Sequence, residues 1–537
     1  MIAHFRPFLI IFLGLCLGIW LTNAFKCFNY IFIFIILGVL VLAFGISFLF
    51  LKFKNKLFGY LWKTKWVVLT LIVSVTLGMG LFVIDSNIKN KVTFEIDSRD
   101  TYTVIARLET APSMNKGSVY SIIVDHIAAV DENGKVAEIK ESIYVTVKDV
   151  NSDKNEELKK LKTGDIVTFT ANIKNILPYG EDRVNAYYIK HNVKYYSYVS
   201  NSEIFVTEVS EYTLIDKAQL VIKNALYANM DEKYAGLAYG ILIGDTSGIT
   251  EDTVENFRIT GIAHLLAVSG LNVVFIITLL MPFFKLIRLK PVIRVIVIVI
   301  ILAIYCVLCN LTASVLRASL MAVFALLGTL FGKQNDSLNS VSLAGILIVL
   351  VTPWSVFDLS FILSFVCVFA IIFLYPIFYD ALRKLKLGNF VSSTLAVSIA
   401  SQIGVLPFMI NSFGYVSTVN LLANFVIVPI LGYVYMFMFL ALILTLLFPF
   451  MGFLLWLCQW GYWFLDVSSA WFASIPYAQV AVASVSIITT LILMISLFIF
   501  SRNFVVKDKI RVYMSVGCLM LLVTSFVLDL VYVGWWL

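Results

Sequence analysis

The most informative stretch of this chain reads Gly261-Ile-Ala-His-Leu-Leu-Ala-Val-Ser-Gly-Leu-Asn-Val273. It opens a long hydrophobic run, yet it contains a histidine, a serine, a glycine and an asparagine. In lipid, each such polar group must find a hydrogen-bond partner or line an aqueous cavity. A helix that served only as a membrane anchor would not need these residues, so the stretch predicts a functional segment of a membrane protein.

The composition is that of a protein that crosses the membrane many times. The chain has 537 residues, 60% hydrophobic and 14% charged, and its mean hydropathy is +0.93. The net charge of +7 comes mostly from Lys and Arg in short loops, which the positive-inside rule explains without an anionic ligand. Seven cysteines lie in or beside apolar runs, so we interpret Cys306 and Cys309 as buried apolar residues rather than a metal or redox pair.

Residues 1–90 contain three apolar runs, near 7–25, 28–51 and 66–85, and the first lacks a signal-peptide cleavage site. Lysines fill the loop between the second and third runs and place it, with the N-terminus, in the cytoplasm. These lysines are Lys52, Lys54, Lys56, Lys63 and Lys65. The segment after the third helix is then extracytoplasmic.

That segment, residues 91–210, changes from apolar runs to alternating polar and apolar residues separated by turns. Five or six strands in this length predict a small all-β domain. The stretch Leu161–Val167 has the tight turn of a barrel strand, and we expect an OB-like barrel. Residues 211–260 predict an amphipathic helical linker, read either as an interfacial stretch or as an ordinary linker helix. Its expected apolar face holds Ala218, Leu220, Val221, Ala225 and Leu226.

Residues 261–537 form a second membrane block. We expect spans near 261–284, 292–310, 313–332, 341–379 (broken), 391–411, 419–449 (broken), 450–475, 480–501 and 512–535. The fold class is therefore a polytopic α-helical membrane protein with about 11–13 membrane segments and one extracytoplasmic all-β domain. Lys and Arg clusters at 285–294, 383–386 and 502–511 fit an alternating path with cytoplasmic loops there and the C-terminus outside.

Proline interrupts two of these spans, at Thr352-Pro353-Trp354 and at Val428-Pro429. Each interruption is open to two interpretations. One is a proline kink in an ordinary helix; the other is a re-entrant segment beside a pathway.

No enzyme site can be assembled from the chain. The four histidines have no HxH or HExxH spacing and no acidic cluster, so we expect neither a metal nor a catalytic centre. Gly328–Gln334 resembles a phosphate loop but is one residue short and lacks the following Ser or Thr. We therefore expect no nucleotide motor and no cofactor.

Isolated polar residues in the membrane block are the remaining candidates. Arg317 in a predicted span costs at least about 2.5–3.5 kcal/mol if left in hydrocarbon. It therefore faces a wet pathway, pairs structurally with Asp358 or Asp466, or snorkels to the interface. Asp358 follows the first proline break and is read either as a helix cap or as a pore residue. Gly244, Asp245 and Gly248 form a tight loop before the key stretch.

Several segments resemble those of the ComEC competence-protein family, in the family's order. They are Ile241–Gly248, Phe257–Val273, Leu316–Met321, Phe357–Phe365, Gln402–Pro407 and Leu422–Pro429. The resemblance covers roughly residues 1–510, and the Gly261–Val273 motif is its specific part. It implies pore or motif residues at Gly244, Asp245, Gly248, His264, Ser269, Gly270, Asn272, Arg317, Asp358, Ser364, Gln402 and Asn424.

The chain departs from the family pattern in three places. Asn272 stands where the family usually has a histidine, and Ile362 where it often has glutamine. An asparagine cannot titrate, which argues against proton coupling there. Many members also carry a C-terminal metallo-β-lactamase-like domain, whereas this sequence stops at Leu537. We therefore expect no nuclease activity from this chain.

The resemblance implies a channel that carries single-stranded DNA across the cytoplasmic membrane in natural competence. The implied partners are single-stranded DNA, lipid, an external DNA receptor, a separate nuclease and a cytoplasmic ATPase; a second copy of the chain is left open. The alternative is a small-solute transporter with broken helices. An intramembrane enzyme is disfavoured because His264 and Ser269, if on one helix, point about 140° apart.

The β domain offers one candidate surface for DNA. Across 91–210 there are 15 Lys and Arg against 18 Asp and Glu, a net charge of −3, which does not favour strong nucleic-acid binding. Aromatic and basic residues are nevertheless interleaved near its end, as base stacking requires. These residues, Tyr187, Tyr188, Lys190, Lys194, Tyr195 and Tyr196, are read either as a DNA-binding patch or as a packed β-surface.

Overall fold

A computed structural model describes most of the chain. The described residues are 6–25, 65–89, 101–115, 119–130, 136–148, 161, 164–176, 188, 191–200, 204–208, 213–266, 268–332, 336–482, 484–500, 514, 517–518 and 520–525. The predicted apolar run 28–51, nearly all of the lysine loop 52–65 and most of the predicted span 512–535 lie outside them. The chain divides into two compact units. One comprises Met1–Leu9, Leu214–Gly345 and Leu359–Leu537; the other comprises Ile10–Thr213 and Ile346–Asp358.

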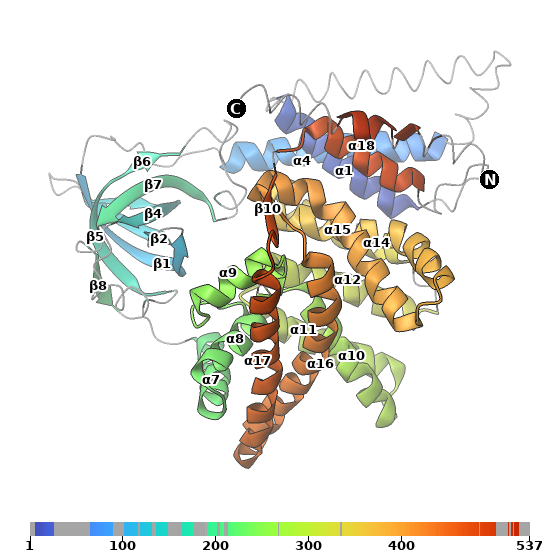
Figure 1. The fold of residues 1–537 in the computed structure, drawn as a ribbon. Helices are drawn as coiled ribbons and strands as arrows, with labels where there is room; N and C mark the ends of the chain where they lie inside the picture. Colours follow the sequence, from blue (N-terminus) through green and yellow to red (C-terminus); the bar gives the residue numbers. More distant parts are fainter. Residues whose placement is uncertain are drawn as a thin grey trace. The chain divides into compact units, whose positions relative to one another are not determined.

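The second unit contains an eight-stranded sheet that curls into a barrel (Figure 1). Its strands are β1 (Thr101–Asn115), β2 (Val119–Val130), β3 (Val136–Ile139), β4 (Ser142–Lys148), β5 (Ile166–Asn172), β6 (Lys174–Asn175), β7 (Val193–Ser200) and β8 (Phe205–Glu208). The strand order is β6-β7-β4-β2-β1-β5-β8, and β3 pairs with β2. The expected all-β domain is confirmed by these strands.

The barrel closes because β5 and β6 lie in succession on one stretch of chain. β5 pairs with β1, while β6 pairs with β7, so the two ends of the sheet meet. Five ribbons therefore surround the interior: β1, β2, β4, β7 and the β5–β6 stretch. β4 and β7 pair in parallel, and the other ladders are antiparallel. Alternate residues such as Val104, Ala106 and Leu108 fill the core, as the period of a strand requires.

Two helices of the same unit cross closely through small residues. α1 (Pro7–Ala24) places Gly14 and Gly18 against α4 (Lys65–Lys89). A Cβ at Gly18 would lie 2.1 Å from the carbonyl oxygen of Val75, so a larger residue would push the helices apart.

The helical unit begins with three short helices, α7 (Leu214–Asn229), α8 (Glu232–Ile243) and α9 (Glu251–Ile259). Every residue of α8 from Ala235 to Ile243 is buried. The segment expected as an amphipathic linker is thus partly interior. Leu226 of α7 is buried, whereas Leu220 and Val221 of the expected apolar face are exposed.

Longer helices follow in the membrane block (Figure 1). They are α10 (Gly270–Leu286), α11 (Pro291–Leu308), α12 (Ala313–Leu330), α13 (Ser337–Val351), α14 (Leu359–Lys384), α15 (Asn389–Phe413), α16 (Asn420–Leu447), α17 (Phe453–Ala473) and α18 (Ile487–Phe500). Among the described residues, seven helices are long and apolar enough to cross a membrane: α1, α4, α11, α12, α14, α15 and α16. Shorter apolar helices lie at α10, α13 and within α18. The polytopic fold with a β domain is confirmed.

The two proline sites behave differently. Pro353 starts a short 3-10 helix, η4 (Pro353–Phe357), between α13 and α14, so that run is broken as expected. Pro429 lies inside α16, which continues from Asn420 to Leu447. The expectation of a broken span there is wrong, because a helix among other helices tolerates the missing N–H.

Two connections in the helical unit are tied together. β9 (Tyr415–Ser417), between α15 and α16, pairs antiparallel with β10 (Gln479–Ala481), between α17 and α18. Thr418 adds hydrogen bonds from its Oγ1 to the carbonyls of Tyr477, at 2.7 Å, and Ala478, at 3.3 Å. A 3-10 turn, η5 (Pro449–Gly452), joins α16 to α17.

Candidate functional site

The key stretch is not helical from its start, which corrects the expected span at 261–284. After α9 the chain turns at Gly261, whose φ is +75° and whose Cβ position faces Asn420 at 2.8 Å. A 3-10 turn, η3 (Ala263–Leu265), follows, and α10 begins only at Gly270. The extended Ser269 caps α10, since its Oγ accepts a hydrogen bond from Leu271 N at 3.3 Å.

The glycine loop before this stretch folds back onto α8. Gly244 ends α8 with φ +97°, and a Cβ there would meet Val268 Cγ2 at 2.7 Å. Asp245 Oδ1 accepts a hydrogen bond from Ser247 N at 2.9 Å, which is ordinary turn chemistry. A Cβ on Gly236 would lie 2.0 Å from the Gly248 carbonyl oxygen, so the loop backbone lies directly on the helix.

Asn272 lies in the interior, only 3% exposed. Its Nδ2 donates to the carbonyl oxygen of Ile241 at 2.8 Å and to Tyr305 Oη at 3.3 Å. Tyr305 in turn donates to the Leu242 carbonyl at 2.9 Å, and Tyr435 donates to Tyr305 at 3.1 Å. Side chains from α10, α11 and α16 thus satisfy the last carbonyls of α8. The site requires a hydrogen-bond donor, which an asparagine supplies through Nδ2 and which an imidazole N–H could also supply.

His264 and Ser269 belong to different elements, so the angle assumed for one helix does not apply. His264 is exposed on η3, whereas Ser269 caps α10 and is half-buried. No hydrogen bond between their side chains occurs among the described residues. Gly270 lies against α12, where its Cβ position faces Ala318 at 3.3 Å.

Arg317 on α12 is 2% exposed and bonds the start of α14. Its Nη2 donates to the Ser360 carbonyl at 2.8 Å and to Ser360 Oγ at 3.0 Å. Intramembrane cations often pair with backbone carbonyls in this way. Asp358 is half-buried between η4 and α14, and its N–H donates to the Ser355 carbonyl at 3.0 Å. Asp466, the other partner considered for Arg317, bonds different residues.

The three remaining motif residues, Ser364, Gln402 and Asn424, are half-buried on α14, α15 and α16. Asn424 donates from Nδ2 to Asn420 Oδ1, one turn earlier on α16. Near Gln402, Gly404 packs against α14, where its Cβ position faces Ala370 Cβ at 2.4 Å. The backbone two residues after Gln402 is therefore in close contact with α14.

Two residues of the expected DNA-binding patch are buried, which corrects that prediction. Tyr195 is in the barrel core at 0% exposure, and Lys194 is buried with its Nζ 3.2 Å from Glu141 Oε1. A register shift between Ser142 and Ile143 lets consecutive residues of β7 point inward. Tyr187 and Lys190 lie outside the described residues.

An aromatic outer surface nevertheless exists on β4 and β7. Tyr144 is paired in register with Tyr196, and its ring lies edge-on to Tyr188 with centroids 5.0 Å apart. Tyr196 contacts Tyr198 at 5.9 Å, and Tyr198 is 55% exposed. Tyr144 and Tyr198 were missed by sequence reasoning, because only the parallel pairing of β4 with β7 reveals them.

A polar cluster around Asp466 was also missed, although Asp466 is the only charged residue from Leu387 to Ser501. Its carboxylate accepts from Lys233 Nζ at 2.5 Å and from Thr253 Oγ1 at 2.6 Å. Two helical turns earlier on α17, Gln459 Oε1 accepts a hydrogen bond from Asp231 N at 3.0 Å. α17 thereby holds both α8 and α9.

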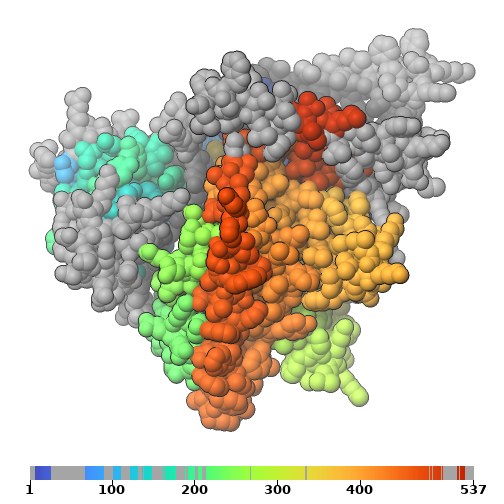
Figure 2. Space-filling view, in the orientation of Figure 1, coloured from blue at the N-terminus to red at the C-terminus, as the bar shows by residue number. Residues whose placement is uncertain are grey.

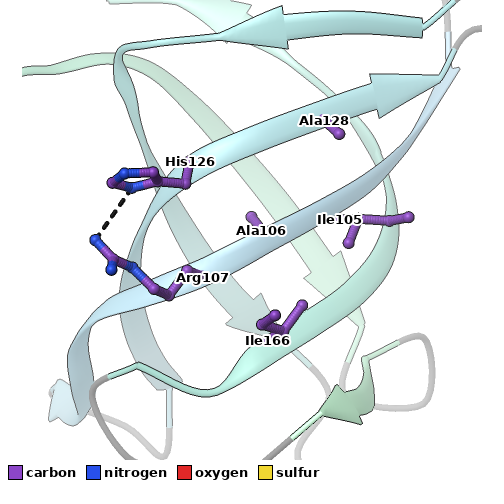
Figure 3. A pocket seen from close by; sticks show the side chains of 6 residues that line it. All are labelled: Ile105, Ala106, Arg107, His126, Ala128 and Ile166. Atoms are coloured by element: carbon purple, nitrogen blue, oxygen red, sulfur yellow. Dashed lines mark hydrogen bonds between the residues drawn. The ribbon is translucent and has the colours of Figure 1, made fainter. Parts of the chain in front are cut away.

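A shallow hollow of about 220 Å³ lies on the outer face of the barrel, lined by Ile105, Ala106, Arg107, His126, Ala128 and Ile166 (Figure 3). Arg107 bonds both carboxylate oxygens of Asp125, at 3.0 and 2.9 Å, and its Nη2 lies 3.1 Å from His126 Nδ1. Burial acts to raise the pKa of Asp125, but the bonds from Arg107 and His126 outweigh it and lower that pKa. No three His, Cys, Asp or Glu side chains among the described residues are arranged to hold a metal ion.

Comparisons with known proteins agree with the motif. Residues 241–504 match the model of a family described as "Competence protein". ComE operon protein 3 of Bacillus subtilis (strain 168) is 30% identical over 196 residues, which is 36% of this chain. The match spans 24% of that relative's length. No solved structure matches the chain.

Proposed function

Through residues 241–504 this chain belongs to the competence-protein family, and we propose that it is a membrane channel for single-stranded DNA in natural transformation. One observation carries the proposal beyond the family match. Outside its α-helices, the family motif has irregular backbone at 244–250, at 260–262 and at 268–269, with the short 3-10 turn η3 between the last two, within a unit of membrane helices. Such backbone is tolerated at membrane depth only where it is buried in protein or lines water.

This segment is buried in protein on one side and exposed on the other. Gly236, Gly248 and Val268 bury one side of the backbone, while Thr246, Ser247 and His264 remain exposed. A polyanion requires a wet and polar path, because bare phosphates cannot enter hydrocarbon. We therefore assign the exposed side of this segment to the conduit wall. His264 and the half-buried Ser269, Asp245, Ser364, Gln402 and Asn424 are the lining candidates. Asn272 and Arg317 hold the wall in position.

The β domain serves as the external receiving surface in this proposal. Its closed five-ribbon barrel with one parallel pair supports the OB-like interpretation. Tyr144, Tyr188, Tyr196 and Tyr198 offer ring faces on which bases of a single strand stack. With a net charge of −3 across residues 91–210, stacking must contribute more than charge.

A cytoplasmic N-terminus fits one contact in the helical unit. Arg6 Nε lies 2.9 Å from Asp336 Oδ2, which joins the chain before α1 to the start of α13. Counting alternating crossings from the basic 285–294 loop puts Asp336 on the cytoplasmic side. Arg6 then lies on that side too. We further propose that a receptor outside, a separate nuclease and a cytoplasmic ATPase supply DNA capture, strand degradation and motive force.

The test is genetic. Deleting the gene in a transformable host and restoring it on a plasmid should abolish and then recover internalisation of labelled DNA, while DNA still binds to the cell surface. Unchanged internalisation in the deletion strain would refute the proposal. A small-solute transporter is less well supported, because α16 runs unbroken through Pro429.

A further inference from the structure

The hollow on the outer face of the barrel lies beside a bulge in β2 (Figure 3). Ile105 is paired with Ala128 and Arg107 with Asp125, so a step of two residues on β1 faces a step of three residues on β2. The extra residue of β2 lets Asp125 and His126 both lie on the outer face, next to Arg107. Bulges often re-aim a side chain in this way. Described residues of the barrel are visible on the surface at the left of Figure 2, in cyan and teal.

His126 has a backbone conformation that its side chain disfavours. Its φ is +49°, in the left-handed region that is uncommon for residues other than glycine. A bulge whose first residue is left-handed usually has glycine there, because glycine has no Cβ. The His126 side chain is 71% exposed, so packing against neighbours does not account for a histidine at this position. Backbone strain at an unpacked position points to a function for the side chain.

Arg107 and His126 present two hydrogen-bond donors at one side of the hollow. Asp125 accepts from Nε and Nη2 of Arg107, whereas no described residue bonds Nη1. Nη2 also lies 3.1 Å from His126 Nδ1, and because arginine has no acceptor, the hydrogen of the neutral imidazole lies on Nε2. A protonated imidazole places its second hydrogen on Nδ1, 3.2 Å from Asp125 Oδ1, and keeps the first. His126 Nε2 is therefore a donor in both protonation states.

The rest of the hollow is apolar. Ile105, Ala106, Ala128 and Ile166 line it beside the two donors, and Ile105 is 40% exposed (Figure 3). Its volume of about 220 Å³ is below the roughly 300–1,000 Å³ of sites that enclose a whole drug-sized ligand. The hollow therefore suits a single flat ring whose attached groups remain in solvent.

The charges around the hollow argue against a phosphate or a carboxylate as its ligand. The hydrogen bond to Asp125, together with attraction from Asp125 and Glu109, raises the pKa of Arg107, so two carboxylates already balance this cation. While His126 is neutral, no other residue that lines the hollow is charged. A ligand that accepts two hydrogen bonds without carrying a charge fits these surroundings better.

A guanine base meets these requirements. Its N7 and O6 are adjacent acceptors, whereas adenine and cytosine present an amino donor and thymine a single acceptor on the corresponding edge. The face of the ring must be uncovered to contact the apolar lining, and stacking within a duplex prevents that contact. We propose that the hollow binds one unpaired guanine base of the strand that the barrel receives, which rests on the proposed function. Arg107 Nη1 and His126 Nε2 donate to the base edge.

The first test measures binding of mononucleotides to the full chain in detergent by equilibrium dialysis. The dissociation constant for dGMP should be about tenfold lower than that for dAMP, and deoxyribose 5-phosphate should not compete. Equal affinity for dGMP and deoxyribose 5-phosphate would make the hollow a phosphate site and overturn the proposal.

His126→Gly separates the side chain from the backbone that carries it. Glycine adopts the left-handed conformation freely, so amide hydrogen exchange of β1 and β2 should be no faster than in the unaltered chain. Binding of dGMP should nevertheless weaken about tenfold, because one donor is lost. The matched control is Asn192→Gly, another left-handed position of the same domain with φ +51°, which should leave binding unchanged. Unchanged binding in His126→Gly would overturn the proposal.

A chemical footprint reads the site directly in the unaltered chain. Diethyl pyrocarbonate acylates neutral imidazoles, and mass spectrometry follows the reaction at His126. Both dGMP and a single-stranded tetranucleotide with one guanine should slow acylation of His126, whereas a hairpin in which that guanine is paired should not. Protection by the hairpin, or by dGMP without protection by the strand, would contradict the proposal.

The guanine site and the channel can fail separately. Loss of DNA internalisation in the deletion strain, with no protection of His126 by dGMP or the strand, would remove the guanine site and leave the channel. Protection of His126 by the strand, with unchanged internalisation in the deletion strain, would retain the guanine site and refute the channel.

Discussion

Asn272 is a buried donor whose task is to satisfy backbone carbonyls at the end of α8. Replacing it with Leu leaves the Ile241 carbonyl and Tyr305 without that donor, so we expect a loss of about 1–3 kcal/mol in stability. Asn272→His should retain most of the stability, because an imidazole N–H can donate in the same place. The thermal midpoint of the detergent-solubilised chain measures both. Equal stability of the Leu and His variants would contradict this role.

Arg317 clamps α12 to the first turn of α14. Arg317→Leu removes two charge-assisted hydrogen bonds to Ser360, each of a kind that contributes about 1.5–3 kcal/mol, and should lower the amount of folded protein in membranes. Ser360→Ala is the matched variant, since it keeps the carbonyl contact and should be milder. Protein level is measured beside DNA uptake. A normal level with no uptake would instead place Arg317 in the pathway.

For single residues, the sequence predicted which polar side chains are important, but it did not predict what those side chains bond. The cost of an intramembrane Arg or Asn was readable from residue type, and both side chains are indeed partnered. Their partners were not readable, because Ser360 is 43 residues from Arg317, Tyr305 is 33 residues from Asn272, and neither stands in an unusual local pattern. Lys194 and Tyr195 were misread because a register shift turned both inward.

Among the elements, α17 holds α8 through an ion pair. Lys233→Met should destabilise the helical unit by about 1–3 kcal/mol, because Asp466, 11% exposed in its side chain, loses its cation. The expected loss of stability is smaller than for a fully buried ion pair, because the Lys233 side chain is 45% exposed and solvent screens its charge. The double variant K233M/D466N should recover part of the loss, since no buried charge is left unpaired. A double-mutant cycle on the thermal midpoint decides the matter; strictly additive losses would exclude the pairing.

The β1–β2 ladder, whose register shifts between Ile105 and Arg107 beside Asp125, should weaken in acid. The pKa of Asp125 is lowered in the folded domain, so its stabilising contribution is present above the ordinary carboxyl range near pH 4. That contribution disappears as the pH falls through the lowered pKa. Hydrogen exchange of β1 and β2 amides should therefore accelerate in acid beyond its intrinsic pH dependence, and Arg107→Ala should abolish the difference. An identical profile in both chains would rule out this source of stability.

Element boundaries followed local signals where those signals were strong. Alternation and turns predicted the strands, and apolar length predicted α11, α12 and α15 closely. Prolines were ambiguous, because Pro353 lies between helices while Pro429 lies inside one. The start of α10 was misplaced, since an apolar run does not reveal that Gly261 turns the chain and Ser269 caps the next helix.

For the whole molecule, the orientation of the chain in the membrane can be measured directly. Glu138→Cys on the exposed strand β3 should react with a membrane-impermeant thiol reagent on intact cells, in a chain stripped of its seven native cysteines. Lys386→Cys, in a loop expected to be cytoplasmic, should react only after permeabilisation. Reaction of both positions in intact cells, or of neither, would refute the proposed orientation.

Fold class and family could be inferred from sequence because hydropathy and a dense local motif carry them. Strand order could not, since the parallel pairing of β4 with β7 joins segments separated by more than forty residues.

The ribbon formed by β9 and β10 has a mechanical consequence. It fastens the α15–α16 connection to the α17–α18 connection, and Asn411 adds a second fastening by bonding both the N–H and the carbonyl of Val485. Neither connection can swing away by itself without breaking these bonds. Four helices therefore share one strap, and Arg258 of α9 packs over the ring of Tyr415 in the same ribbon, at 5.3 Å from its centroid. Any widening of the helical unit at this end must therefore carry these helices as a block.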